Sequence, residues 1–368
     1  MIYKPTFRVT SSMFNLIGKM EAAREIVQSV ALPLDIEREF REDASAKMTH
    51  YSTKIEGNRL TLKQTKELIE GHTVIAREID KREAMNYYDC LDLIHRHSKT
   101  KKPITEKIIK KIHSVVQKGI VKGKLRGEYR EAQNAIYDSA TRKAVYFPPE
   151  AKEVPLLMKP FLSWLNGDPE THPILKAGVA HYQFVSIHPF MDGNGRTARA
   201  LATLILYQRG YDLKRFYSLE EYYAEDLKGY YDALHECQGV HYYDNPNPDI
   251  TLWLEYFLNG AAIIFERVKE KALLASQKRL SPQSGKDVEL LQKIGPRERR
   301  VLTHFRKNLQ IRTKNLCTLF GIKERSARDL LGKWMEAGLI KKQGAGKRDA
   351  YYVLTADYRR LIGEEKNG

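Results

Sequence analysis

Apolar positions along the first 270 residues recur mostly at three- and four-residue spacing, which is the period of a helix with one buried face. Alternation of apolar and polar residues, the mark of a strand, is scarce in the same region. We therefore expect a mainly α-helical fold. The clearest helical stretches are Met85–Ile94, Ile108–Val116, Val154–Leu165, Leu175–Ile187 and Ala198–Tyr207.

The stretch Asn134–Phe147 has the pattern of a short β-hairpin instead. Ala-Ile-Tyr and Ala-Val-Tyr-Phe flank the polar sequence Asp-Ser-Ala-Thr-Arg-Lys. Pro148 and Pro149 follow directly, and proline ends a strand because it has no backbone N–H to donate. The helical part of the chain should therefore contain one hairpin.

The C-terminal part has a different order of elements. The polar stretch Gln277–Lys286 contains Pro282 and Gly285 and is typical of a linker. Three short helical patterns and then two strand patterns around a glycine-rich turn follow it, which is the order of a winged helix. The helical patterns are Pro296–Asn308, Thr313–Phe320 and Lys323–Ala337, the last ended by Gly338. We expect an N-terminal helical region at 1–100, a helical core at 101–270, a linker at 271–294 and an α+β winged-helix domain at 295–368.

Composition places the chain among ordinary globular proteins, with 42% apolar and 29% charged residues. No apolar run is long enough to cross a bilayer, and the three cysteines suggest neither disulfides nor a zinc site. We expect a cytoplasmic protein that does not enter a membrane. The net charge of +16 is concentrated near the C-terminus, where residues 295–350 hold 15 Lys plus Arg against 5 Asp plus Glu. This excess favours a polyanion-binding module, although a solvated basic surface that binds nothing explains it equally well.

The stretch from His188 to Arg199 carries the clearest chemistry. Pro189 and the glycines interrupt one apolar helix, and a second helix starts near Arg196. Gly193, Asn194 and Gly195 then precede a helix N-terminus, where unpaired backbone N–H groups bind phosphate. Arg196 and Arg199 are three residues apart and can face one anion.

Two further side chains complete a reaction centre. Asp192 is an acid beside an anion site, which makes sense if the carboxylate holds Mg²⁺ that also binds phosphate oxygens. His188 stands ahead of the loop and can accept a proton from an attacking hydroxyl. Each feature alone has an ordinary structural explanation, as a core histidine, a turn or a solvated helix face. Together they indicate phosphoryl or nucleotidyl transfer from a metal-bound di- or triphosphate.

This stretch resembles the signature of the Fic family, His-Pro-Phe-x-Asp/Glu-Gly-Asn-Gly-Arg-x-x-Arg, at every defined position. The resemblance extends over roughly Ile104–Leu258 and implies a Fic-type helical core, with the hairpin as a flap that pairs with the target segment. It implies transfer of AMP from ATP to a Ser, Thr or Tyr hydroxyl of a protein, with release of pyrophosphate.

The family pattern also implies a role for each residue. His188 would be the base, Phe190 the buried anchor, Asp192 the Mg²⁺ ligand, and Gly193, Asn194 and Gly195 the phosphate cradle, with the Asn194 side chain helping. Arg196 would bind the β-phosphate and Arg199 the γ-phosphate of ATP, while Tyr230 and Tyr231 would line the adenine pocket. Asp226 and Leu227 replace the Asn-Arg or Asn-Lys pair that relatives often have, which leaves the base contacts open.

An N-terminal segment resembles the inhibitory helix motif of the same family, Ser/Thr-x-x-x-Glu-Gly/Asn. Its residues here are Ser52, Glu56 and Gly57. A two-pronged pair between Glu56 and Arg199 would occupy the arginine that should take the γ-phosphate. The enzyme would then be autoinhibited. Removal of AMP from a target, which the same glutamate supports in some relatives, stays open.

The basic C-terminal region looks like the winged helix that several Fic proteins carry. Leu316, Leu319, Leu330 and Leu331 would form its core, Arg325, Ser326, Arg328 and Lys333 its recognition helix, and Lys341, Lys342, Lys347 and Arg348 its wing. It would bind DNA through residues 295–350 or, equally, serve a protein contact or a homodimer. Two other functions stay open: a DNA-binding regulator whose core only senses nucleotide, and an enzyme that uses another nucleotide donor. The target would be another protein or the chain itself.

Overall fold

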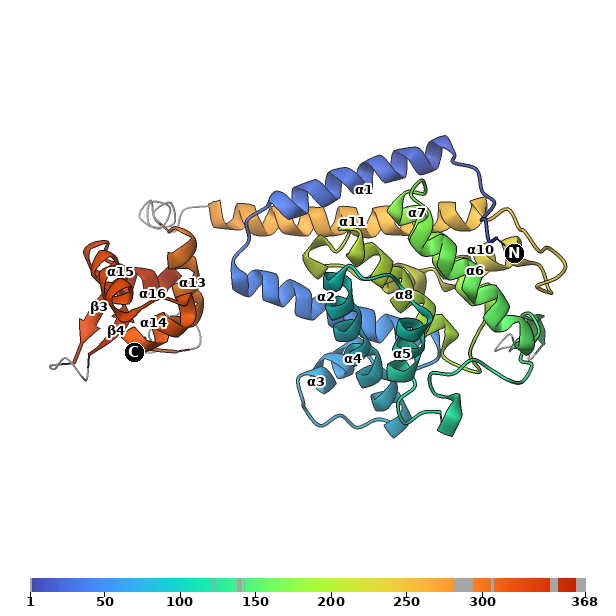
Figure 1. Cartoon of the computed structure of the whole chain (residues 1–368), viewed down its shortest axis with the longest axis horizontal. Coiled ribbons are helices and arrows are strands. Elements are labelled where there is room, and N and C mark those ends of the chain that lie inside the picture. Colours follow the sequence, from blue (N-terminus) through green and yellow to red (C-terminus); the bar gives the residue numbers. More distant parts are fainter. Residues whose placement is uncertain are drawn as a thin grey trace. The chain divides into compact units, whose positions relative to one another are not determined.

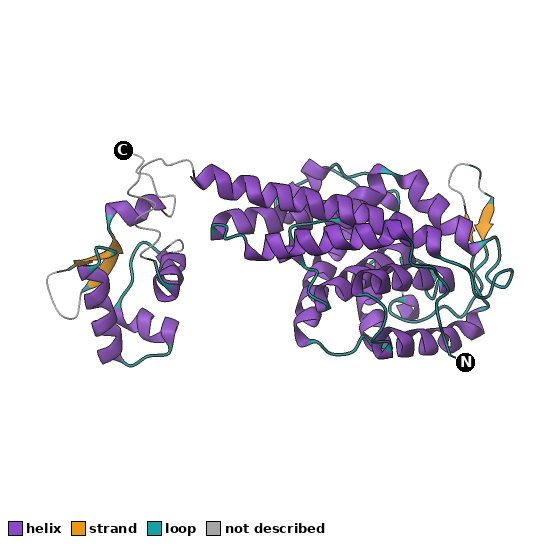
Figure 2. Cartoon of the chain, turned by 90° about the horizontal axis from the view of Figure 1, so that it is seen from above, coloured by secondary structure: helices purple, strands orange, loops and turns teal. Residues whose placement is uncertain are grey.

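The computed structural model describes residues 2–121, 123–137, 141, 143–280, 294–305, 308–344 and 350–361. It divides into two compact units, Met1–Ser276 and Gln277–Gly368, which are described separately. Figure 1 labels their elements along the chain, and Figure 2 shows that helices dominate both. The expected mainly helical fold with small two-stranded sheets is confirmed.

In its described residues, the first unit consists of α-helices, three short 3-10 helices and one hairpin. Helix α11 continues past residue 271, where the sequence suggested a linker, and residues 281–293 of that linker lie outside the described residues. The α-helices are α1 (Ser11–Ser29), α2 (Leu34–Ile55), α3 (Leu62–Ile69), α4 (Glu78–Thr100), α5 (Glu106–Val116), α6 (Val154–Gly167), α7 (Pro173–Ile187), α8 (Asn194–Gln208), α9 (Leu219–Glu225), α10 (Leu227–Gln238) and α11 (Thr251–Leu280). The 3-10 helices are η1 (Gly123–Leu125), η2 (Ala151–Glu153) and η3 (Leu213–Arg215).

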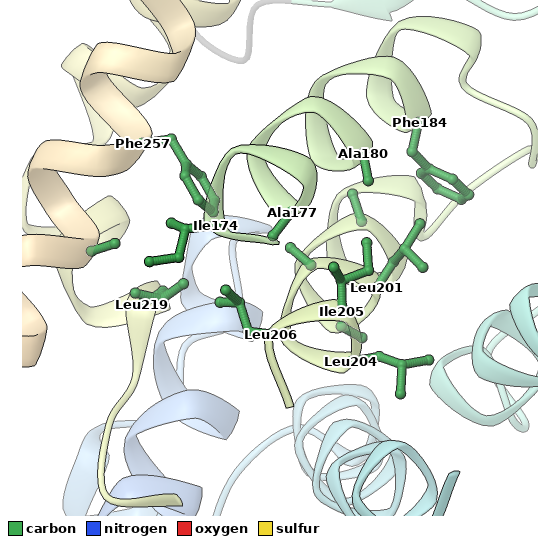
Figure 3. Close-up of a cluster of buried hydrophobic side chains, with 14 of the residues drawn as sticks. Ile174, Ala177, Ala180, Phe184, Leu201, Leu204, Ile205, Leu206, Leu219 and Phe257 are labelled. Atoms are coloured by element: carbon green, nitrogen blue, oxygen red, sulfur yellow. The ribbon is translucent and has the colours of Figure 1, made fainter. Parts of the chain in front are cut away.

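Helices α7 and α8 form the centre of this unit. Every residue of α7 from Ile174 to Ile187 is buried, because α7 is surrounded by other helices rather than exposed on one face. Figure 3 shows apolar side chains of α7 and α8 meeting, with Phe257 of α11 and Leu219 of α9 beside them. Packing on both α7 and α8 therefore fixes the two ends of the loop that joins them.

The predicted hairpin is present, although short. Strand β1 (Ile136–Tyr137) pairs antiparallel with β2 (Ala144–Tyr146), and the register shifts between Ile136 and Tyr137. Residues 138–140 and 142 of its turn lie outside the described residues. Beyond β2, the Phe147 N–H donates to the Val240 carbonyl, and the Tyr242 N–H donates to the Phe147 carbonyl.

The second unit has its own core around Val301, Leu316, Leu331 and Trp334. Its elements are α13 (Pro296–Phe305), α14 (Thr313–Phe320), α15 (Glu324–Glu336), β3 (Ile340–Gln343), β4 (Tyr351–Leu354) and α16 (Ala356–Leu361). Gly321, in the left-handed conformation, ends α14, the first of two helices that a short turn joins. Strands β3 and β4 pair antiparallel in regular register. The expected wing residues Lys347 and Arg348 lie outside the described residues.

In the described part of the chain, no helix combines the length and apolar character needed to cross a membrane.

Candidate functional site

The predicted loop joins the two central helices. Helix α7 ends at His188, whose backbone is left-handed at φ 51° and ψ 58°. Helix α8 begins at Asn194, and its N-cap Gly193 is left-handed at φ 75°, a conformation that glycine adopts without strain. The first N–H groups of α8 have no partner within the helix. They therefore face the loop as potential anion donors.

Phe190 and Asn194 hold the loop in shape. The Phe190 side chain is fully buried and stacks on His113 of α5 at 3.7 Å between ring centroids. The Asn194 side chain accepts from the Phe190 N–H at 2.9 Å and donates to the Phe190 carbonyl at 2.8 Å. The Asn194 side-chain amide therefore stabilises the loop backbone. From the sequence, we expected this side chain to help bind phosphates.

His188 is positioned by its backbone. Its carbonyl accepts from Arg130 Nε at 2.9 Å, and Arg130 is itself buried. Its ring Nδ1 lies 3.3 Å from the Val185 carbonyl, which leaves Nε2 for another partner. Burial lowers the pKa of His188 to about 4, and the charge of Arg130 acts in the same direction. The ring is therefore neutral near pH 7, the state in which it can accept a proton.

Asp192 lies just before the helix start with a partly exposed side chain, 56% of which is accessible. Its Oδ1 accepts from the Gly193 N–H at 2.7 Å, and its Oδ2 accepts from Gln117 Nε2 at 3.2 Å. The His113 ring and the Asp192 carbonyl are 2.9 Å apart, so α5 fixes both ends of this residue. A carboxylate with solvent-facing oxygens fits a hard cation such as Mg²⁺.

The segment Ser52–Asn58 ends helix α2 with a Schellman motif. Gly57 is left-handed at φ 91°, its N–H donates to the Lys54 carbonyl, and the Asn58 N–H donates to the Thr53 carbonyl. This turn places Glu56 at the C-cap of α2. The glycine is needed because other residues pay steric strain in that conformation.

Arg199 is bound to the end of α2. Its Nε donates to Ser52 Oγ at 2.9 Å, and its Nη2 donates to the Ser52 carbonyl and to Glu56 Oε1, both at 2.8 Å. The sequence suggested a two-pronged pair with Glu56. The described contacts instead comprise one bond to Glu56 and two to Ser52, because the arginine fork reaches along the last turn of α2.

The Glu56 carboxylate lies against the start of α8. A Cβ atom on Gly195 would come within 2.3 Å of Glu56 Oε1. Burial raises the pKa of Glu56, but the charges of Arg199 and Arg196 and the bond from Arg199 outweigh burial and lower it overall. Glu56 is therefore an anion placed where the loop offers its donors.

Arg196 has a partner outside the loop. Its guanidinium is 3% exposed, and Nη1 lies 3.0 Å from Glu83 Oε1 of α4. Its Nη2 lies 3.8 Å from Asp192 Oδ2. Arg196 Nε is buried and has no hydrogen-bond partner among the described residues. An oxyanion bound at the helix start would be a suitable partner for such a donor.

The two predicted adenine-site tyrosines differ in exposure. Tyr230 of α10 is buried, and its hydroxyl lies 2.9 Å from His181 Nε2 of α7. Tyr231 is 39% exposed. Asp226, which departs from the family pattern, caps α10 by accepting from the Gly229 N–H at 3.2 Å. Of this pair, Tyr231 has the exposed surface with which a ligand could make contact.

Four residues at this site were missed from the sequence: Glu83, His113, Gln117 and Arg130. Each lies on another element, and its spacing from the loop follows no local period. A buried-polar pattern on apolar helices could have drawn attention to His113 and Gln117 of the α5 region, since both are almost fully buried. No sequence signal singles out Glu83, whereas Arg130 ends the stretch Gly127-Glu-Tyr-Arg130, which resembles the family pattern although no role was assigned to it.

The fold and site define a helical domain with a glycine-containing loop between the two buried helices α7 and α8. Residues 103–206 match the Fic/DOC family model. Protein adenylyltransferase Fic of Drosophila melanogaster is 32% identical over 199 residues, or 53% of this chain and 39% of that protein. The protein of Drosophila willistoni is 31% identical over the same length. Residues 103–206 thus match the Fic/DOC model, and about half of the chain is distantly similar to protein adenylyltransferase Fic. It spans less than half the length of these curated relatives.

Solved structures share the fold. A Fic domain containing signaling protein from Bacteroides thetaiotaomicron is 26% identical, with a TM-score of 0.60 over 73% of this chain and 98% of that one. A Fic family protein from Desulfovibrio desulfuricans is 22% identical, with a TM-score of 0.60 over 96% and 99% of the two chains. Fic-1 from C. elegans is 23% identical, with a TM-score of 0.54 over 72% and 73%. The first unit therefore has the Fic fold.

Proposed function

We propose that this chain is an autoinhibited protein AMP-transferase, which moves AMP from ATP to a Ser, Thr or Tyr hydroxyl and releases pyrophosphate. The observation that carries the proposal is the constellation around the start of α8. A neutral histidine, a solvent-facing carboxylate, a glycine-capped helix N-terminus and two buried arginines meet there within one loop and its helix. Similarity to protein adenylyltransferase Fic supports AMP as the transferred group.

In the proposed reaction, His188 takes the proton of the attacking hydroxyl. The hydroxyl oxygen bonds to the α-phosphorus while the bond to the bridging oxygen of the β-phosphate breaks, so pyrophosphate leaves. The N–H groups at the start of α8 and the Arg196 guanidinium hold the phosphates in place. Positioning and charge stabilisation supply most of the catalysis, and no covalent enzyme intermediate is needed.

Asp192 is the residue that would hold Mg²⁺. The described residues contain no group of three or more His, Cys, Asp or Glu side chains that could hold a metal by themselves. Mg²⁺ suits a single carboxylate because it usually keeps waters and takes substrate phosphate oxygens as its other ligands. When bound, it would neutralise charge on the departing pyrophosphate.

The autoinhibition in this proposal rests on Arg199. An arginine bonded to Ser52 and Glu56 cannot also grip a γ-phosphate, and the Glu56 anion repels that phosphate. ATP would then bind in a pose unsuited to in-line attack. Displacing Glu56 would free Arg199 and complete the site.

We propose that the target segment binds at the hairpin of β1 and β2. Strand β1 has only β2 as a described strand partner, so its other edge can pair with an extended peptide. Tyr137 on β1 is 62% exposed and would contact that peptide. The target itself is a protein of unknown identity or the chain's own surface.

A labelling experiment tests the proposal. The Glu56→Gly variant is incubated with Mg²⁺ and ATP labelled at either the α- or the γ-phosphate, with the parent chain as control. We expect protein-bound label only from the α-labelled ATP, and more in the variant. Label from the γ-position would indicate phosphoryl transfer instead, and equal label in variant and parent would contradict autoinhibition. UTP in the same assay tests the other-donor alternative.

The nucleotide-sensor alternative is separated by His188→Ala in the Glu56→Gly background. For an enzyme, this change should abolish transfer while ATP binding, measured by calorimetry, stays within about twofold, since the histidine serves the attacking hydroxyl rather than the phosphates. Unchanged labelling would contradict the assigned base.

For the second unit, we propose a winged helix that binds duplex DNA. Lys323, Arg325, Arg328 and Lys333 are exposed on or next to α15, and Lys341 and Lys342 are exposed on β3, although Arg328 pairs with Glu324 at 2.7 Å. Such a basic surface beside a second helix favours phosphate contacts. Retention of the full chain on duplex DNA that falls steeply with salt would support this, and no retention at low salt would contradict it.

A further inference from the structure

Glu83 of α4 is the nearest counter-ion of Arg196, although 113 positions separate the two residues in sequence. Helix α4 packs along α8 in the first unit (Figure 1). The Glu83 side chain is only 15% exposed, and its Oε1 lies 3.0 Å from Arg196 Nη1. A pair this deeply buried fixes the direction of the guanidinium more firmly than a surface pair would.

Asn58 holds Glu83 in turn. Its Nδ2 donates to Glu83 Oε2 and to the Asp80 carbonyl, both at 2.9 Å, while its Oδ1 accepts from the Leu60 N–H at 3.1 Å. Asn58 is buried, and all these partners are close. The carboxylate is therefore fixed at both oxygens, one by Asn58 and one by Arg196.

Without Glu83, the nearest acid for Arg196 is Asp192. The Nη2 to Oδ2 distance is already 3.8 Å, and the residues are four apart, a spacing at which a full ion pair forms readily. Such a pair would cancel the cation proposed for the β-phosphate and the carboxylate proposed for the metal. In this structure the contact is long, at 3.8 Å, and the proposed site needs it to stay long so that each group keeps its charge for its own ligand.

Gln117 holds Asp192, the second residue of the Arg196–Asp192 pair. Its Nε2 donates to the same Oδ2 of Asp192 at 3.2 Å, and its side chain has no exposed surface. A Cβ atom on Gly193 would come within 2.1 Å of that nitrogen, so the amide fills the space that glycine leaves. The Asp192 carboxylate is thereby anchored from the α5 side.

We propose that Glu83, held by Asn58, and Gln117 are positioning residues that keep the 3.8 Å contact between Arg196 and Asp192 from closing, so that the arginine serves a β-phosphate and the carboxylate a divalent cation. This inference rests on the proposed nucleotide site. It assigns a function to three residues outside the loop, and none of them touches the reacting atoms.

The role of Glu83 is tested by measuring the affinity for ADP and for AMP by calorimetry. The measurements use the full chain in the Glu56→Gly background with Mg²⁺ present. Glu83→Gln should weaken ADP binding about tenfold, the effect of losing one charge-assisted bond. AMP binding should change by less than about twofold, since AMP has no β-phosphate to report the loss. Glu78→Gln, on the same helix with a side chain 78% exposed, is the matched control and should bind both like the parent.

Unchanged ADP binding in Glu83→Gln, or equal weakening of ADP and AMP, would overturn the positioning inference while the nucleotide site stands. Failure of the Glu56→Gly parent to bind ADP would overturn the proposed function and this inference with it. If Glu83→Gln does not fold by melting temperature, Asn58→Ala serves instead. It should weaken ADP selectively but less, because Glu83 is then loosened rather than neutralised.

The role of Gln117 is tested by measuring how tightly a divalent metal binds. Gln117→Leu removes the donor at similar volume. Binding of Mn²⁺ to the ADP complex, followed by electron paramagnetic resonance, should weaken about tenfold. ADP binding without metal should stay unchanged. Equal Mn²⁺ binding in variant and parent would overturn the role of Gln117.

Discussion

At the scale of single residues, the surroundings of His188 determine whether its ring is protonated. Its ring is held by the left-handed backbone at the end of α7, and its carbonyl by Arg130. A base in the loop must be neutral before it can accept a proton. Burial provides this, since it disfavours the imidazolium ion and lowers the pKa to about 4.

The pH dependence of transfer follows from this pKa. We expect the Glu56→Gly enzyme to keep its transfer rate from pH 8 down to about pH 5, because the His188 ring stays neutral until the pH nears 4. An ordinary histidine would already lose the rate near pH 6.5. Removing Glu56 also removes a charge that raises the pKa of His188, so the pH at which the rate falls cannot shift upward on that account. Initial rates at constant ionic strength and saturating Mg²⁺ measure it. A half-maximal rate at or above pH 6.5 would contradict the assignment.

At the scale of elements, the end of α2 decides where Glu56 lies. The Schellman motif requires the left-handed Gly57, and the motif directs the carboxylate toward α8. The inhibitory contact in the proposal therefore depends on a backbone turn as much as on the glutamate. The geometry of this turn can be changed without touching either charged partner.

Substitution of Gly57 tests that dependence. Gly57→Val places a β-branched residue at φ 91° and should cost about 1–2 kcal/mol of stability. It should also raise self-labelling by ATP because Glu56 is displaced. Gly57→Asn, which tolerates the left-handed region better, is the matched control and should stay closer to the parent. Identical labelling in all three proteins would show that the turn does not set the contact.

At the scale of the whole molecule, the chain's pattern predicted the fold well and the site unevenly. The apolar stretches Leu175–Ile187 and Ala198–Tyr207 lie within α7 and α8, since apolar runs of helical length can be recognised from neighbouring residues alone. The loop between them is contiguous, so His188, Asp192 and Arg196 could be assigned together. Contacts such as Glu83 with Arg196 depend on helix packing, which no local spacing encodes.

The details of the contact between Arg199 and the end of α2 could not be predicted from the sequence either. Ser52 and Glu56 stood out by resemblance, but the division of Arg199 donors between them depends on how α2 packs against α8. The same limit applies to Asn194, whose amide binds the loop backbone. Side-chain geometry of this kind is decided by tertiary packing.

Buried histidines should make the first unit acid-sensitive. Burial and the charge of Arg199 lower the pKa of His181 to about 3, whereas an unfolded chain has a histidine pKa near 6.5. The unfolded state then binds the proton more readily, so stability is full above pH 6.5 and falls as the pH drops toward 3. Melting temperatures between pH 7 and 4 should decline, and less steeply in His181→Asn. Equal slopes for the two proteins would contradict this source of acid sensitivity.

In the proposed function, the loop between α7 and α8 transfers AMP and Glu56 restrains it. Intact-mass spectrometry of the Glu56→Gly protein after incubation with ATP and Mg²⁺ tests it most directly. We expect a covalent gain of one AMP per modified site, absent from Glu56→Gly/His188→Ala and smaller in the parent chain. No gain in Glu56→Gly, or an equal gain in the double variant, would contradict it.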